Sequence, residues 1–264
     1  MCEEVEIKKE KRKINLDDLY GLAGIWTGFG LMMIVACAIG YFSPELGIMS
    51  KYISVAAFGR YLGEWFACIE EEEYKALFDD KKNCRIANII FYAMCIFVFF
   101  QLQPVGGFSN YYLMFLSGIL SISFFIDMKI QELPDLINAT FLVMTIILFI
   151  LYVPQHLLTA VILAIILTIP YAVMGYFGGL GFGDVKLLFP ISMLYALSST
   201  TTLYIADQFL EFWSYTLIAT FIYLVPMVVY NIVKNKPVKG IKFAFGPFII
   251  IGFFVLILGL FNLF

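Results

Sequence analysis

The chain has 264 residues, of which 62% are hydrophobic, 18% aromatic and 14% charged, and its formal net charge is −3. Such a composition leaves too few polar side chains to cover a water-soluble globule, so it excludes that class and predicts a protein that crosses the bilayer several times. We expect no nucleic-acid partner.

Apolar segments long enough to cross a hydrocarbon core of about 30 Å recur along the chain and predict an all-α bundle of eight or nine transmembrane helices. The eight clear candidates are residues 20–43, 85–103, 110–126, 137–153, 156–178, 187–204, 208–233 and 241–263. Residues 51–68 are a doubtful ninth span, because they carry Lys51, Arg60 and Glu64. An interfacial or bundle-facing helix is the alternative for that segment.

The distribution of Lys and Arg predicts the orientation. Residues 2–18 form a charged, solvated tail without an evident cleavable signal peptide, and basic residues cluster at 8–13, 75–85 and 234–242. Four other connections contain no Lys or Arg: residues 44–50, 104–109, 154–156 and 205–207. The basic connections should be cytoplasmic, which places the protein in the plasma membrane with its N-terminus inside if there are nine spans.

An acidic run, Glu70–Glu73, lies in one of these cytoplasmic connections. Most such runs are solvated loops, but this one could attract a basic segment of a partner. Further along, Asp127 ends an apolar run and is followed by Lys129. Glu132 and Asp135 follow in the same loop and compete with Asp127 for any functional role.

A second acid, Asp184, stands behind a run of glycines, Tyr176-Phe177-Gly178-Gly179-Leu180-Gly181-Phe182-Gly183-Asp184, and is followed by Lys186. An ionisable group near hydrocarbon costs roughly 2.5 to 3.5 kcal/mol, so a carboxylate here suggests a functional site. A structural reading is also open, in which Asp127 and Asp184 are interfacial anchors and Gly181 and Gly183 form a tight turn. Lys129 and Lys186 fit topology determinants better than catalytic groups.

The residue inventory limits the chemistry. The sole histidine, His156, lies in a predicted outer connection, which leaves a Ser-His-Asp or Cys-His mechanism without a base. The five cysteines, Cys2, Cys37, Cys68, Cys84 and Cys95, form no C-x-x-C pair, so neither a metal nor a disulfide is indicated and no cofactor is expected. Two aspartates that share a proton can instead activate water and protonate a peptide carbonyl.

Three segments resemble the type IV prepilin peptidases and archaeal preflagellin (archaellin) peptidases, which are membrane aspartyl proteases of the GxGD type. They are Gly178–Leu188, Asp127–Ile137 with its Pro134, and Phe245-Gly246-Pro247-Phe248. The resemblance implies an aspartic endopeptidase with Asp127 and Asp184 as the catalytic pair and Gly181 and Gly183 shaping the loop. Its implied substrate is a prepilin-like or preflagellin precursor, whose short basic leader is removed at the cytoplasmic face.

The resemblance covers residues 110–264, which we expect to form a six-helix catalytic core. Residues 1–109, the tail with two or three further helices, carry no motif of the family and could bind substrate or only enlarge the bundle. Many bacterial members have a zinc-binding loop with two C-x-x-C pairs and also methylate their product. Neither pair is present here, so the resemblance favours the archaeal branch and makes methyltransferase activity doubtful.

Two other classes of function are open. A secondary transporter could use Asp127 and Asp184 as proton or ion sites, although such sites should lie near the middle of the membrane rather than at its cytoplasmic edge. A structural or assembly component would need the two acids only for topology and should tolerate their replacement by asparagine.

Overall fold

The chain forms an all-α bundle. The computed structural model describes residues 16–100, 108–177, 181–198 and 244–261, together with isolated positions between 214 and 234. The helices are α1 Leu16–Phe42, α2 Pro44–Glu70, α3 Glu72–Asp79, α4 Lys81–Phe99, α5 Phe108–Ile130, α6 Asp135–Tyr152, the 3-10 turn η1 Pro154–His156, α7 Leu157–Tyr176, α8 Phe182–Ser198 and α10 Gly246–Phe261. Apart from isolated positions, the predicted span over residues 208–233 lies outside the described residues.

Within the described part of the chain, five helices are long and apolar enough to cross a membrane. They are Leu16–Phe42, Lys81–Phe99, Asn110–Ile130, Asp135–Tyr152 and Pro154–Tyr176. The protein is therefore a multi-pass membrane protein, as its composition predicts. The expected spans over 187–204 and 241–263 correspond to α8 and α10, whose described lengths are 17 and 16 residues.

The doubtful span over residues 51–68 is helical and lies within α2, which is not one of the five. Its Arg60 is buried, lies 3.7 Å from Glu64 and faces the rings of Tyr61 and Phe91 at 5.3 and 5.6 Å. Burial of a guanidinium is tolerated where a carboxylate and aromatic faces replace part of its hydration. The Arg60 side chain thus faces the bundle, and a span over residues 51–68 stays a prediction.

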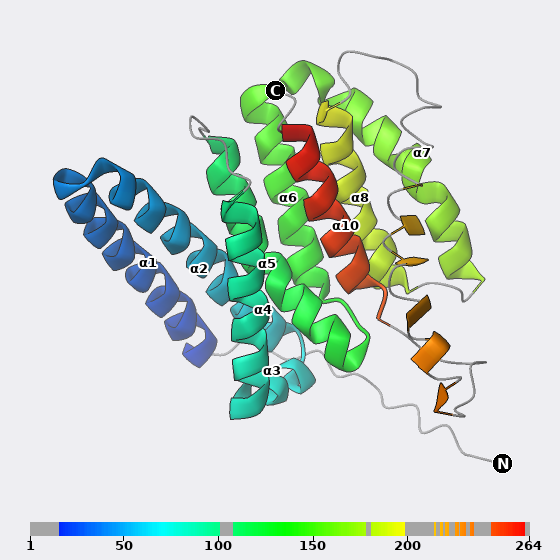
Figure 1. Ribbon diagram of the computed structural model, residues 1–264, viewed down its shortest axis with the longest axis horizontal. Helices are drawn as coiled ribbons and strands as arrows, with labels where there is room; N and C mark the ends of the chain where they lie inside the picture. Colours follow the sequence, from blue (N-terminus) through cyan, green and yellow to red (C-terminus); the bar gives the residue numbers. More distant parts are fainter. Residues whose placement is uncertain are drawn as a thin grey trace.

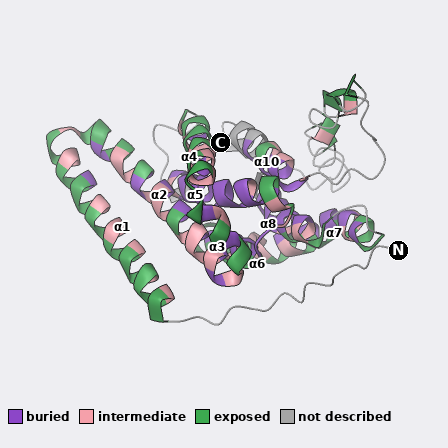
Figure 2. Ribbon diagram, turned by 90° about the horizontal axis from the view of Figure 1, so that it is seen from below, coloured by how far each residue is buried: buried purple, intermediate pink, exposed green. Residues whose placement is uncertain are grey.

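Helix α5 is the centre of the bundle. In its most apolar 18-residue stretch 78% of the residues are buried, against 6% in α1. α2, α4 and α10 pack around α5, and α1 packs on α2 at the edge of the molecule (Figures 1 and 2). The apolar surface of α1 is consequently exposed, as expected for a helix that faces lipid.

Glycines bring α2 and α5 into backbone contact. A Cβ built on Gly118 of α5 would fall on the carbonyl oxygen of Ala56 and lie 2.8 Å from the backbone nitrogen of Arg60. Four residues apart on α2, Gly59 faces the backbone of Phe115 almost as closely, and the added Cβ of Gly63 would lie 3.1 Å from the side chain of Ile119. Small residues at this spacing allow close helix packing in a membrane, where the hydrophobic effect contributes little to association.

One end of the bundle collects the C-termini of α2 and α5 and the N-termini of α6, α8 and α10 (Figure 1). α5 ends at Ile130, and the next residue, Gln131, has a left-handed φ of 63° and donates its N–H to the carbonyl of Asp127 at 2.9 Å. Pro134 then precedes the first residue of α6. This short connection turns the chain back and keeps Asp127 in the last turn of α5, next to the start of α6.

Candidate active site

Asp127 is a buried acid on the central helix, with 3% of its surface exposed. The backbone N–H of Gly246, the first residue of α10, donates to its carboxylate. Its Oδ2 atom is buried and has no hydrogen-bond partner among the described residues. A buried carboxylate oxygen without a donor from the protein is energetically unfavourable.

Asp184 lies in the first turn of α8 and is 8% exposed. The backbone carbonyl of Gly181 accepts from the N–H groups of Asp184 and Val185 at 3.1 and 3.4 Å, and the N–H of Gly181 donates back to the Asp184 carboxylate. This reciprocal arrangement resembles a capping box, which satisfies free N–H groups at a helix start. The segment from Gly181 to Asp184 therefore both begins α8 and orients the acid.

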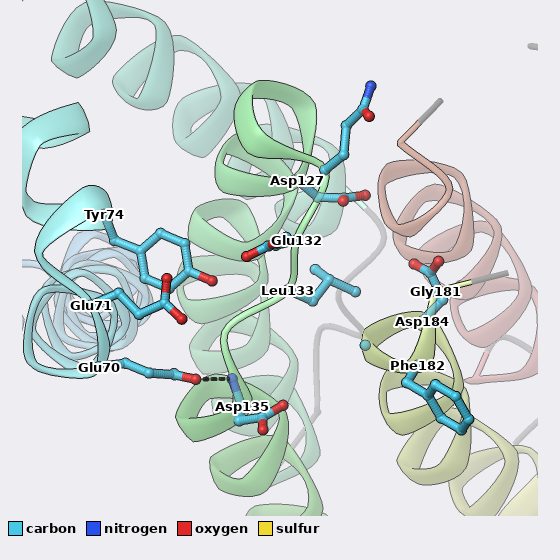
Figure 3. A pocket seen from close by; sticks show the side chains of 12 residues that line it. Glu70, Glu71, Tyr74, Asp127, Glu132, Leu133, Asp135, Gly181, Phe182 and Asp184 are labelled. Atoms are coloured by element: carbon cyan, nitrogen blue, oxygen red, sulfur yellow. Dashed lines mark hydrogen bonds between the residues drawn. The ribbon is translucent and has the colours of Figure 1, made fainter. Parts of the chain in front are cut away.

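Asp127 and Asp184 line one pocket of about 390 Å³ at this end of the bundle. The two acids approach from α5 and α8 on facing sides of the pocket (Figure 3), close enough for their charges to interact. The other lining residues are Glu70, Glu71, Tyr74, Gln131, Glu132, Leu133, Asp135, Gly181, Phe182 and Gly183. The pocket thus contains a pair of nearly enclosed carboxylates beside a wider acidic rim.

The competing acids Glu132 and Asp135 line the same pocket but differ in surroundings. The side chain of Asp135 is 60% exposed and accepts two hydrogen bonds from the ammonium of Lys186, at 2.7 and 2.8 Å. Glu132 is half-buried. Neither Glu132 nor Asp135 is as deeply buried as Asp127.

The two lysines lie apart from the buried acids. Lys186 is directed at Asp135, and its ion pair links α8 to the start of α6. Lys129 is exposed on the last turn of α5 and does not line the pocket. Neither lysine places its positive charge between Asp127 and Asp184. Both positions fit residues at a membrane boundary.

Gly183 and Gly246 provide space for one side chain, Leu133. A Cβ built on Gly183 would lie 3.0 Å from the Cβ of Leu133, and one built on Gly246 would lie 3.1 Å from its Cδ1 and 2.8 Å from Oδ2 of Asp127. A side chain at either glycine would displace these neighbours. Gly181 is more open, since its added Cβ would meet Oδ2 of Asp184 at 3.1 Å.

Two pocket residues lie on the N-terminal helices: Tyr74 was not identified from the sequence, and Glu70 was expected only as part of the acidic run that could attract a partner. Tyr74 of α3 is buried, and its burial, followed by the carboxylates of Glu71 and Glu132, raises the pKa of its hydroxyl. It therefore remains a neutral phenol at physiological pH. Glu70, at the end of α2, accepts hydrogen bonds from the backbone N–H groups of Asp135 at 2.8 Å and Leu136 at 3.0 Å.

Other expected features lie away from the pocket. His156 is in η1, and Cys37, Cys68, Cys84 and Cys95 are free thiols. No group of three or more His, Cys, Asp and Glu side chains is arranged to hold a metal ion in the part of the chain that the structure describes. Cys2 and the glycines at 178 and 179 lie outside the described residues.

The sequence profile of the type IV leader peptidase family matches residues 114–264, which is more than half of the chain. The chain belongs to the type IV leader peptidase family. This membership confirms the resemblance found in the sequence and makes the protein a membrane protease. No curated protein and no solved structure matches the chain.

The region matched by the family profile contributes only one side of the pocket. α6, α7, α8, α10 and most of α5 lie within the matched region, and with them both buried aspartates. α1 to α4 lie outside it, although α2, α3 and the residue between them supply Glu70, Tyr74 and Glu71 to the pocket of this leader peptidase. The N-terminal helices therefore form one wall of the pocket.

Proposed function

We propose that this leader peptidase is an aspartic endopeptidase in which Asp127 and Asp184 are the catalytic pair. The observation that carries the proposal is the enclosure of both carboxylates in one pocket, at 3% and 8% exposure, with one oxygen of Asp127 lacking a donor among the described residues. Two carboxylates so placed ionise one at a time, because the first negative charge opposes the second.

The pair would work as base and acid in turn. The ionised member takes a proton from water as the water oxygen attacks the scissile carbonyl carbon, and the protonated member donates to the carbonyl oxygen. The tetrahedral intermediate then expels the amine, which receives a proton from the member that first acted as base. The other member takes back a proton from a hydroxyl of the intermediate, so the product acid forms and the pair returns to its starting state. Tyr74 stands in the same pocket as a neutral donor.

We propose a prepilin-like or preflagellin precursor as substrate, cut at the cytoplasmic face of the plasma membrane. The absence of C-x-x-C pairs from the sequence favours the archaeal kind of precursor. Of the acidic run at 70–73, Glu70 and Glu71 line the pocket, whereas Glu72 and Glu73 are exposed outside it. A basic leader would lie against the acids that line the pocket, among them Glu71 and Glu132.

Cleavage of purified precursors by the purified full-length chain, followed by N-terminal sequencing of the product, tests this function. One precursor should be prepilin-like and one preflagellin-like, each with a short basic leader ahead of an apolar helix. Replacing both Glu71 and Glu132 by Gln should raise KM for these precursors, and Glu73→Gln is the matched control. Uncut precursors in the presence of correctly folded enzyme would contradict the substrate class.

The transporter alternative receives no support from the family membership, which places the chain among peptidases. A protein that acted only as a transporter would leave the precursors uncut. The same cleavage assay therefore separates the two functions.

A further inference from the structure

Helix α6 begins without a local cap. Pro134 occupies its N-cap position and makes no side-chain hydrogen bond to the helix. The first N–H groups of a helix need acceptors from elsewhere, and those of Asp135 and Leu136 find them in the two carboxylate oxygens of Glu70. A carboxylate at this place also interacts favourably with the positive end of the helix dipole. A residue 65 positions away in the sequence thus performs the role of the missing cap.

The start of α6 is in turn attached to the segment that carries Asp184. Asp135 binds Lys186 of α8, and the side-chain amide of Asn138 donates to the carbonyl of Gly183 at 3.5 Å. Leu133, two residues before α6, fits against Gly183 and Gly246. A shift of the α6 N-terminus would therefore move contacts on both sides of the pair, because Gly246 holds Asp127 and Gly183 precedes Asp184.

From these contacts we infer that Glu70 is a positioning residue of the peptidase, which fixes the start of α6 and through it the relative placement of Asp127 and Asp184. The inference rests on the proposed function of the two aspartates. It gives the N-terminal helices, which lie outside the family match, a role in catalysis: α2 supplies the acceptor that holds the catalytic core in its active arrangement.

The position of Glu70 is costly for a residue with only a structural role. Burial raises the pKa of Glu70, against the lowering effect of the N–H groups of Leu136 and Asp135. Ionisation of Glu70 is therefore less favourable in the folded protein than in the unfolded chain. A group kept in such a place is better explained by a requirement of the active arrangement than by stability.

The test compares Glu70→Ala, Glu70→Gln and Glu73→Ala in the full chain, with a basic-leader precursor as substrate. Misplacement of reacting groups can cost up to about 100-fold in rate, so Glu70→Ala should lower kcat by a factor of that order with little change in KM. Glu70→Gln keeps one acceptor oxygen and should be intermediate. Glu73→Ala removes the same charge from an exposed position and should behave as wild type.

Two further measurements separate positioning from general destabilisation. Hydrogen exchange at the Asp135 and Leu136 amides should accelerate in Glu70→Ala, while exchange in α4 stays unchanged. The thermal midpoint of Glu70→Gln at neutral pH should not fall below that of wild type. A kcat loss that follows the thermal midpoint, an effect confined to KM, or unchanged exchange at the two amides would each overturn the inference.

The failure of this inference is distinguishable from the failure of the proposed function. Inactive Asp127→Asn and Asp184→Asn together with a fully active Glu70→Ala would overturn the role of Glu70 alone. Active aspartate variants would overturn the proposed catalytic pair and the positioning role that depends on it.

Discussion

Leu133 lies against Gly183 so closely that a Cβ on the glycine would be 3.0 Å from the Cβ of Leu133. This contact joins the connection after α5 to the first turn of α8, and so relates the two helices that carry the buried aspartates. A larger residue at 183 would therefore require Leu133 to move by a few tenths of an ångström.

Gly183→Ala should lower kcat substantially, because the added methyl group must push Leu133 and the start of α8 apart. A displacement of about 1 Å near reacting groups can cost about 100-fold, so the few tenths of an ångström needed here should cost less than that. Precursor cleavage under single-turnover conditions measures the effect. Gly24→Ala on α1, whose added Cβ has nothing within 4 Å, is the matched control and should leave the rate unchanged. A Gly183→Ala enzyme with the wild-type rate would show that this spacing is not important.

Gly246→Ala should act directly on Asp127. Its Cβ would come within 2.8 Å of Oδ2 of Asp127 and 3.1 Å of Cδ1 of Leu133, so the carboxylate has to turn away from its present position. If Asp127 acts in the transition state, kcat and kcat/KM should fall together while KM changes little. Steady-state kinetics on a single precursor decide this. A rise in KM alone would instead assign Gly246 to substrate binding.

Gly118→Ala should destabilise the protein by about 1–3 kcal/mol through overpacking, since its Cβ meets backbone atoms of α2 that cannot move separately. The expected observation is a lower thermal midpoint in detergent, with separation of α2 from α5. Gly28→Ala, an alanine introduced into open space on α1, provides the comparison. Equal midpoints for the two variants would contradict the close packing of α2 on α5.

The pH dependence of stability should change in Glu70→Gln. The raised pKa of Glu70 means that the folded state binds its proton more tightly than the unfolded state does. Its contribution to the free energy of unfolding is therefore greatest below the ordinary value of 4.5 and declines as the pH rises through the raised pKa. In Glu70→Gln this part of the decline in the free energy of unfolding with rising pH should be absent.

Thermal midpoints recorded from pH 4 to pH 8, roughly the range in which shifted carboxyl groups titrate, measure the difference. Glu73→Gln, exposed on α3, should follow the wild-type curve. Parallel curves for wild type and Glu70→Gln would show that burial of Glu70 has no energetic effect.

The sequence was sufficient to predict the fold class and to select the two buried acids. Hydrophobic runs of span length have few alternatives in a bilayer, and the basic connections fix which helix ends share a face. Asp127 and Asp184 both fall at such ends, so their joint position in one pocket follows from local patterns. Family membership then agreed with the resemblance carried by these same segments.

The remaining features depend on contacts between distant parts of the chain. The bond from Glu70 to the start of α6 joins residues 65 positions apart, and the acidic run around it resembles any solvated loop. Residues 51–68 were a doubtful span because Lys51, Arg60 and Glu64 interrupt their apolar character, whereas in the bundle Arg60 is buried. The close packing of Leu133 against Gly183 and Gly246 likewise depends on three segments that are distant in the sequence.

The most direct test of the account measures precursor cleavage by wild type, Asp127→Asn, Asp184→Asn and Asp79→Asn, with N-terminal sequencing of the product. Asp79 is exposed at the end of α3 and outside the pocket, so its variant controls for the loss of one acid. We expect the first two variants to fold and bind precursor without cutting it, while Asp79→Asn cuts at the wild-type rate. Cleavage by Asp127→Asn or Asp184→Asn at the wild-type rate would contradict the proposed catalytic pair.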